Sequence, residues 1–174
     1  SPLPGPALLM ANGFHMMFPL GDPPDYEPAP EKSIAAMAER EGRPPREILY
    51  DLMMEKKGRG FIYLPLIGYA NGDLEAIREM MEHPKTVFGL SDGGAHCGLI
   101  CDGSFPSFLM VRYGRDRTRG NRLELEWLVK RQTSDTARLI GLEDRGVIQV
   151  GKRADLNLID WEAMQLRPPE MLFD

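Results

Sequence analysis

The spacing of apolar and polar positions predicts three helices with two short apolar runs around the third. Apolar residues recur at helical spacing over residues 31–42, 45–58 and 71–83, and each pattern stops at Gly42, Gly58 or Pro84. We expect Asn71 to cap the third helix. The runs "GFIYLPL" (60–66) and "KTVFGLS" (85–91) flank that helix and are apolar nearly throughout. Strands of a parallel sheet covered on both faces have this character, so the pattern predicts a strand–helix–strand unit.

The remaining pattern divides the chain into three regions. Prolines crowd the first part and predict an irregular arm over residues 1–29. Helices continue after the second strand over residues 104–114, 122–133 and 134–141, so residues 30–145 form one α/β region. From residue 146 the period changes: "GVIQVGKRADLNLID" predicts a β-hairpin, which places residues 146–174 in a different layer.

Composition narrows the kinds of partner. The 174 residues include 43% apolar ones, which suits a globular core, and the net charge of −5 argues against general nucleic-acid binding. The one basic patch, residues 112–122, is interpreted as a solvated loop. Cys97 and Cys101 are too few for a disulfide framework, and the sequence shows neither a secretory signal nor a membrane span. We therefore expect a cytoplasmic protein that binds neither nucleic acid nor membrane.

The candidate chemistry lies directly after the second predicted strand, in "SDGGAHCG" (91–98). Ligands of parallel α/β folds bind at the carboxyl ends of the strands, and Asp92 has that position. Gly93 and Gly94 let the backbone turn sharply and approach a ligand closely. The alternative is a plain turn, because Asp-Gly is among the commonest turn dipeptides.

Other candidates are weaker. His96, Cys97 and Cys101 are residue types that bind zinc, but the sequence lacks the second ligand pair of a self-contained site. Tyr63, on the first predicted strand, either faces a site or packs as an ordinary aromatic residue. A serine hydrolase built from Ser91 or Ser104 is disfavoured, because nucleophile, base and acid would be crowded into too few residues.

Three longer segments carry a family resemblance. They are "SIAAMAEREGRPPREILYDLMMEKKGRG", "DLEAIREMMEHPKTVFGLSDGGAH" and "LELEWLVKRQTSDTARLIGLEDRGVIQVGKRADLNLID". In this order they resemble the carboxyl-terminal portion of the D-aminoacylase (N-acyl-D-amino-acid deacylase) branch of the amidohydrolase superfamily. The last segment is typical of the superfamily, and "HPKTVFGLSDGGAH" of the branch.

The resemblance implies an α/β fold, a partial (β/α)8 barrel of a metal-dependent hydrolase running into a small β-sandwich. Residues 61–66 then correspond to the seventh barrel strand and residues 86–90 to the eighth. Residues 30–145 become the carboxyl-terminal part of the barrel, and residues 146–174 the start of the small β domain.

The resemblance also implies site roles. Asp92 matches the catalytic aspartate, which contacts the metal, takes a proton from zinc-bound water and delivers it to the departing amine. Tyr63, Asn71 and His96 follow barrel strands and are the candidate contacts for the substrate, an N-acyl (D-)amino acid or a similar amide.

The other zinc ligands of the family have no counterpart in this sequence, so we expect most ligands to lie outside this chain. Alone, the chain should be inactive and should associate with itself or with the missing part of the barrel. The alternative is a non-catalytic structural or interaction fragment.

Overall fold

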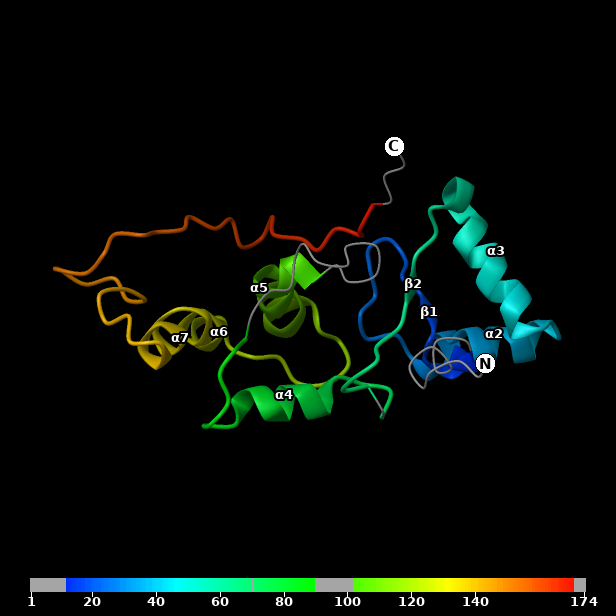
Figure 1. Cartoon of the computed structure of the whole chain (residues 1–174), viewed down its shortest axis with the longest axis horizontal. Helices are drawn as coiled ribbons and strands as arrows, with labels where there is room; N and C mark the ends of the chain where they lie inside the picture. Colours follow the sequence, from blue (N-terminus) through cyan, green and yellow to red (C-terminus); the bar gives the residue numbers. More distant parts are fainter. Residues whose placement is uncertain (1–11, 70, 90–101, 171–174) are drawn as a thin grey trace, which may run out of the picture. The chain divides into compact units, whose positions relative to one another are not determined.

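The computed structural model describes residues 12–69, 71–89 and 102–170 (Figure 1). They form two compact units. The first contains the described residues up to Ala76 and those from Arg167 onward, and the second is Ile77–Leu166. The division predicted from the sequence, residues 1–29, 30–145 and 146–174, stays a prediction.

Two helices dominate the first unit, and both confirm the sequence pattern. Helix α2 (Ile34–Glu41) begins after Ser33, whose Oγ accepts a hydrogen bond from the Ala36 backbone N at 3.2 Å. It ends at Gly42, which has φ +64°, a left-handed conformation that glycine adopts without steric cost. Helix α3 (Pro45–Gly58) begins with a proline at its first turn, where no intrahelical donor is lost.

The last turn of α3 departs from helical geometry. Lys56 and Lys57 have positive φ, and the chain folds back so that the Gly60 backbone N donates to the Met53 carbonyl at 3.3 Å. A Cβ at Gly60 would lie 1.9 Å from the Leu52 carbonyl oxygen. Only glycine fits there.

The core of the first unit lies between these helices and a two-stranded sheet. Short 3₁₀ turns, Phe14–Met16 and Pro30–Lys32, flank strand β1 (Phe18–Pro19). Strand β1 pairs antiparallel with β2 (Ile62–Tyr63), Phe18 opposite Tyr63. The residues that form the core are Met17, Ile34, Ala38 and Ile48, with Phe14, Met37, Leu49, Leu52, Ile62 and Leu64 packed against them. The proline-rich arm expected to be irregular therefore supplies core residues and a strand.

The two predicted parallel strands do not pair with each other in the described part of the chain. Strand β2 lies within residues 61–66, but its partner is β1, and residues 86–89 form no strand. A parallel strand needs neighbours on its edges to satisfy its backbone groups, and two segments alone do not supply them. The partial (β/α)8 barrel and the small β-sandwich remain predictions.

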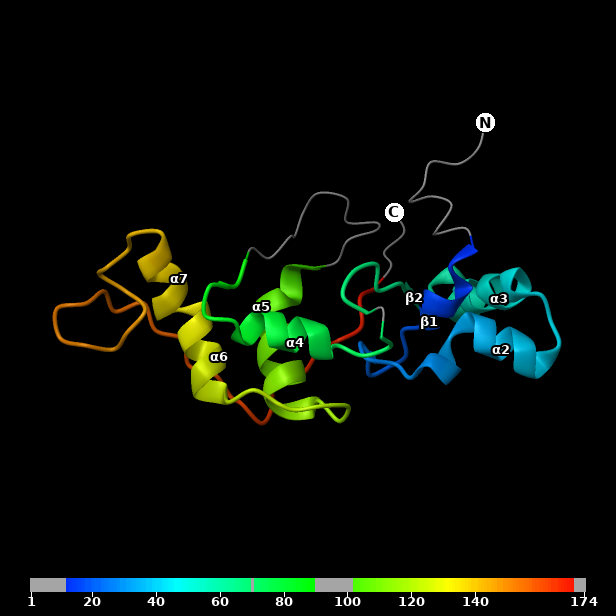
Figure 2. The same cartoon turned by 90° about the horizontal axis from the view of Figure 1, so that it is seen from below.

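The second unit is helical (Figure 2). Helix α4 (Glu75–Glu82) ends before Pro84, as predicted, but it begins four residues after Asn71. The predicted Asn71 cap is therefore wrong. Asp73 takes the local role, its Oδ1 accepting from the Glu75 backbone N at 3.0 Å. The carboxylate of Asp73, two positions before the helix, reaches the first free N–H group of the helix. Asn71 lies four positions before the helix, which is too far to do so.

After the undescribed stretch the chain continues in five helical elements. They are a 3₁₀ turn (Asp102–Ser104), α5 (Phe105–Phe108), the π-helix η4 (Leu109–Asp116), α6 (Leu125–Gln132) and then α7 (Ser134–Leu139). Leu109, Val111 and Tyr113 of η4 are buried together with Leu123 and Leu128. The helices predicted over residues 104–114, 122–133 and 134–141 are confirmed, although the first is largely a π-helix.

The segment after α7 differs from the predicted hairpin. No strand forms between residues 146 and 160 in the structure, and Val150 (101%) and Leu158 (103%) are fully exposed residues. A hairpin with one apolar face needs a layer to pack against. The segment is held instead near Trp161, because Arg115 donates to the carbonyls of Trp161 at 2.6 Å and Met164 at 2.7 Å.

Candidate functional site

Two predicted site residues, Asp92 and His96, lie outside the described residues, as do Cys97 and Cys101. Their expected roles stay predictions. The structure does describe the chain on both sides of that stretch, up to Gly89 and again from Asp102. The site can therefore be built from the segments that flank it.

The two flanks meet at an aromatic cluster in the second unit. Phe88 is buried and packs edge-on against Trp127 of α6, with ring centroids 5.7 Å apart and planes at 75°. It also packs against Phe105, the first residue of α5, at 6.5 Å and 85°. Edge-to-face pairs of this kind stabilise by about 0.5–1.5 kcal/mol each beyond the area that they bury. The chain thus leaves the cluster at Phe88 and returns to it at Phe105.

Arg131 of α6 completes this cluster. Its guanidinium lies 5.5 Å from the centroid of the Phe88 ring and 5.3 Å from that of Trp127, within the range of cation–π attraction. Its Nη2 donates to the carbonyl of Met81, at 3.3 Å, and to that of Thr86. The side chain is 10% exposed, so these contacts are largely shielded from water.

The charge of Arg131 is balanced by Asp135 of α7. The Asp135 Oδ2 accepts from Arg131 Nη1 at 3.4 Å, while Lys130 Nζ donates to both carboxylate oxygens at 2.7 and 2.8 Å. The hydrogen bond from Lys130, and then the one from Arg131, lowers the pKa of Asp135 below its ordinary value. The carboxylate is therefore ionised under neutral conditions and holds both cations in place.

After the undescribed residues 90–101, arginines of the basic patch (residues 112–122) make contacts inside the protein. Arg117 is 1% exposed, lies 5.5 Å from the Tyr113 ring centroid and donates to the Asn121 carbonyl at 2.9 Å. Arg115 pairs with Asp116, and this hydrogen bond lowers the pKa of the Asp116 carboxyl. The sequence interpretation of residues 112–122 as a solvated loop is wrong for Arg117, because its cation stacks on an aromatic ring and supports the turn after η4.

Tyr63 and Asn71, the predicted substrate contacts within the described residues, have different surroundings. Tyr63 is half-buried on β2, and its ring meets that of Tyr26 edge-on at 5.5 Å and 90°. This contact agrees with the alternative of a packed aromatic residue. Asn71 is exposed in the turn before α4. Their roles toward a substrate stay predictions.

The described residues do not fit a zinc site on their own. No group of three or more His, Cys, Asp or Glu side chains in that part of the chain is placed to hold a metal ion. His15 and His83 are exposed, and the Nδ1 of His83 accepts from the Lys85 backbone N at 3.3 Å. No helix among the described residues is both long and apolar enough to cross a membrane.

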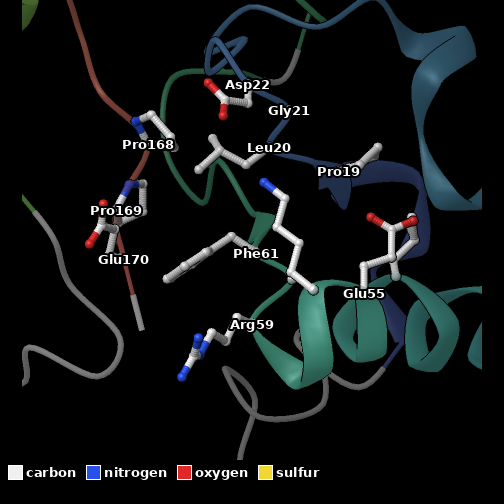
Figure 3. Close-up of a pocket in the computed structure, with 13 residues that line it drawn as sticks. Pro19, Leu20, Gly21, Asp22, Glu55, Arg59, Phe61, Pro168, Pro169 and Glu170 are labelled. Carbon is white, nitrogen blue, oxygen red and sulfur yellow. The ribbon is translucent and has the colours of Figure 1, made fainter. Parts of the chain in front are cut away.

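A cavity of about 680 Å³ lies in the first unit (Figure 3). The end of β1, the last turn of α3 and residues 168–170 surround it. Its charged lining residues are of both signs: Asp22, Glu55, Lys56, Arg59 and Glu170. This mixture favours no single class of ligand, and neither Tyr63 nor Asn71 is among the described residues that line it.

Sequence reasoning missed both the cavity and the Arg131 cluster. Gly60 carried one signal, since an isolated glycine can mark a close approach of two backbone segments. The sequence carried no signal for the role of Arg131. It follows Lys130 on an amphipathic helix, and the pattern predicts a surface residue.

Comparison with known proteins places the chain in a family. The model of the amidohydrolase family matches residues 19–173, nearly the whole chain. No curated protein and no solved structure matches it. The match includes the cluster around Arg131 and the stretch that carries Asp92. The chain therefore belongs to the amidohydrolase family.

Proposed function

We propose that this chain is the carboxyl-terminal part of a zinc-dependent hydrolase that cleaves the amide bond of N-acyl (D-)amino acids or a similar C–N bond. The family match over residues 19–173 supports the hydrolase class of this proposal, but not the substrate. The D-aminoacylase branch rests on the resemblance of "HPKTVFGLSDGGAH", residues 83–96, to that branch.

Asp92 is the acid/base residue in this proposal. Its carboxylate takes a proton from the water whose oxygen attacks the amide carbonyl carbon. As the C–N bond breaks, it returns that proton to the nitrogen of the departing amine, so the products are a carboxylic acid, which then ionises to the carboxylate, and a free amine. The role rests on the resemblance of "HPKTVFGLSDGGAH" to the branch, and Asp92 follows Phe88, a residue of the aromatic cluster, by four positions in the sequence.

The zinc ligands would come mostly from outside this chain, as the described residues offer no group that fits the ion. When bound, the metal would supply an activated water and polarise the carbonyl. The chain by itself would then be inactive. It would work with the rest of the barrel, or associate with itself through surfaces that the barrel otherwise covers.

The test is the substitution Asp92→Asn in the full-length protein that carries this chain. Turnover of N-acetyl-D-amino acids should fall by about 10²–10⁴-fold, the usual contribution of general acid–base catalysis. Zinc content, measured by atomic emission, should stay near that of the wild type. Asp144→Asn is the matched control, because Asp144 is an exposed carboxylate that pairs with Arg145 at the surface. An Asp92→Asn protein that retains full turnover would remove the assignment.

The second candidate is a non-catalytic structural or interaction fragment. It is favoured by the lack of a metal-binding group among the described residues. Under this alternative, the longest natural protein that contains the chain would bind less than one zinc ion and hydrolyse none of the acylated amino acids. If that protein binds zinc in stoichiometric amount and has amidase activity, the non-catalytic alternative is wrong.

A further inference from the structure

Arg131 fastens three pieces of the second unit to one another. Its own helix α6 carries Trp127, Met81 belongs to the last turn of α4, and Thr86 and Phe88 lie on the segment that follows. The contacts come from one guanidinium group: two hydrogen bonds to carbonyl oxygens and two cation–π contacts. Removing it would free the end of α4 and the segment 86–88 together.

Neither carbonyl has a partner from regular secondary structure. The Met81 carbonyl is one of the last four of α4, which have no intrahelical donor, and a cation near a helix C-terminus is favourable. The Thr86 carbonyl lies in a segment that forms no strand. Arg131 thus provides hydrogen bonds that a sheet or helix would otherwise supply.

Arginine suits this place better than lysine. The planar guanidinium donates in several directions at once and stacks on aromatic faces, whereas an ammonium is a compact, strongly hydrated charge. Here Nη1 faces Asp135 while Nη2 reaches both carbonyls, and the plane lies near two rings. A lysine would keep the charge but could not make this set of contacts.

We propose that Arg131 is a positioning residue for the proposed hydrolysis: it fixes the backbone from Thr86 to Phe88, which precedes Asp92 by four residues in the sequence. The inference rests on the proposed function of Asp92. In this proposal Arg131 acts through this backbone and does not itself take part in the reaction. Its loss should lower the rate of the chemical step more than the affinity for substrate.

The experiment uses Arg131→Lys and Arg131→Met in the full-length protein. The probe is the best substrate from a panel of N-acetyl-D-amino acids. We expect kcat to fall at least tenfold for Arg131→Lys, and no less for Arg131→Met, while KM changes less than twofold. The controls are Arg138→Lys and Arg138→Met: Arg138 lies 3.8 Å from the same Asp135, but its side chain is 73% exposed. These controls should keep kcat within twofold.

A second readout does not depend on activity. Hydrogen–deuterium exchange of residues 82–89 should become at least tenfold faster in Arg131→Lys, with residues 34–58 unchanged. If the Arg131 variants do not fold, Phe88→Leu removes the ring from the held segment and leaves Arg131 in place. It should lower kcat at least threefold with little change in KM.

The outcomes separate this inference from the proposed function. An Arg131→Lys protein with wild-type kcat, or one whose KM changes more than its kcat, overturns the positioning role even where Asp92→Asn is inactive. So does a Phe88→Leu protein with wild-type kcat. Full activity of Asp92→Asn instead overturns the proposed function itself.

Discussion

Glu27 offers a sharp test of how the first unit is held together. The residue is 1% exposed, and its Oε1 accepts a hydrogen bond from the backbone N of Leu74, the residue directly before α4, at 2.8 Å. The first N–H groups of a helix have no intrahelical acceptor. A carboxylate 47 positions away in the sequence therefore does the work of a cap. The perturbations are Glu27→Gln, which keeps an acceptor oxygen, and Glu27→Ala, which removes it.

The two variants should differ in the free energy of unfolding. Glu27→Gln loses a negative charge at a helix N-terminus, worth about 0.3–1 kcal/mol and up to about 2 kcal/mol when partly buried. Relief from burying the charge offsets part of this, so the net loss should be about 1 kcal/mol. Glu27→Ala leaves the buried Leu74 N–H without its acceptor, at about 1–3 kcal/mol, and deletes apolar contact worth about 0.8 kcal/mol per methylene. The total loss should reach about 3 kcal/mol.

Urea unfolding of the full-length protein, followed by far-ultraviolet circular dichroism, would measure both losses. The control is Glu31→Ala, an exposed glutamate in the 3₁₀ turn that follows the same segment; it should stay within about 0.5 kcal/mol of the wild type. A Glu27→Ala protein as stable as this control would refute the capping argument. Equal losses for Gln and Ala would show that charge, and not the acceptor, is what matters.

Two further predictions concern other parts of the chain. Gly60→Ala should destabilise by more than 1 kcal/mol in urea unfolding, because its Cβ would meet the Leu52 carbonyl at 1.9 Å, whereas Gly89→Ala, with open space, should not. The Asp135→Asn protein should be less stable than the wild type at about pH 7, but nearly as stable as the wild type below the folded-state pKa of Asp135. The Lys130 hydrogen bond lowers the folded-state pKa of Asp135 below its ordinary value, so the stabilisation is complete well above that ordinary value and is lost as the pH falls through the folded-state pKa; urea unfolding at several pH values checks this.

The helices of the first unit were predictable because their signals are local. Gly42 ends α2, and the Pro44-Pro45 pair opens α3, each through the backbone geometry of one or two residues. The limit of this reasoning appears at Asn71. Asn71 is a residue type that caps helices, but it lies four positions before α4, and Asp73 and the distant Glu27 accept hydrogen bonds from the Glu75 and Leu74 N–H groups instead.

The strand predictions were less reliable because a strand depends on neighbouring strands and packing layers that are not adjacent to it in the sequence. Residues 85–91 and 146–160 have the composition of strands, but composition does not supply a neighbouring edge or a layer to pack on. Strand β2 found its partner in Phe18 and Pro19, inside an arm whose prolines argued for irregular structure. Proline is tolerated there because an edge strand can leave one donor position unpaired.

The least predictable feature is a pair of buried charges at the two ends of α4. The carboxylate of Glu27 meets the N-terminal end through Leu74, and the guanidinium of Arg131 meets the C-terminal end through the Met81 carbonyl. Each sign matches the helix dipole at its end. In the sequence both residues look like ordinary surface charges, since burial of a charged side chain depends on contacts 40 or more positions away. Thr86 and Phe88 follow α4 in the sequence, and Arg131 holds both the C-terminal end of the helix and this segment.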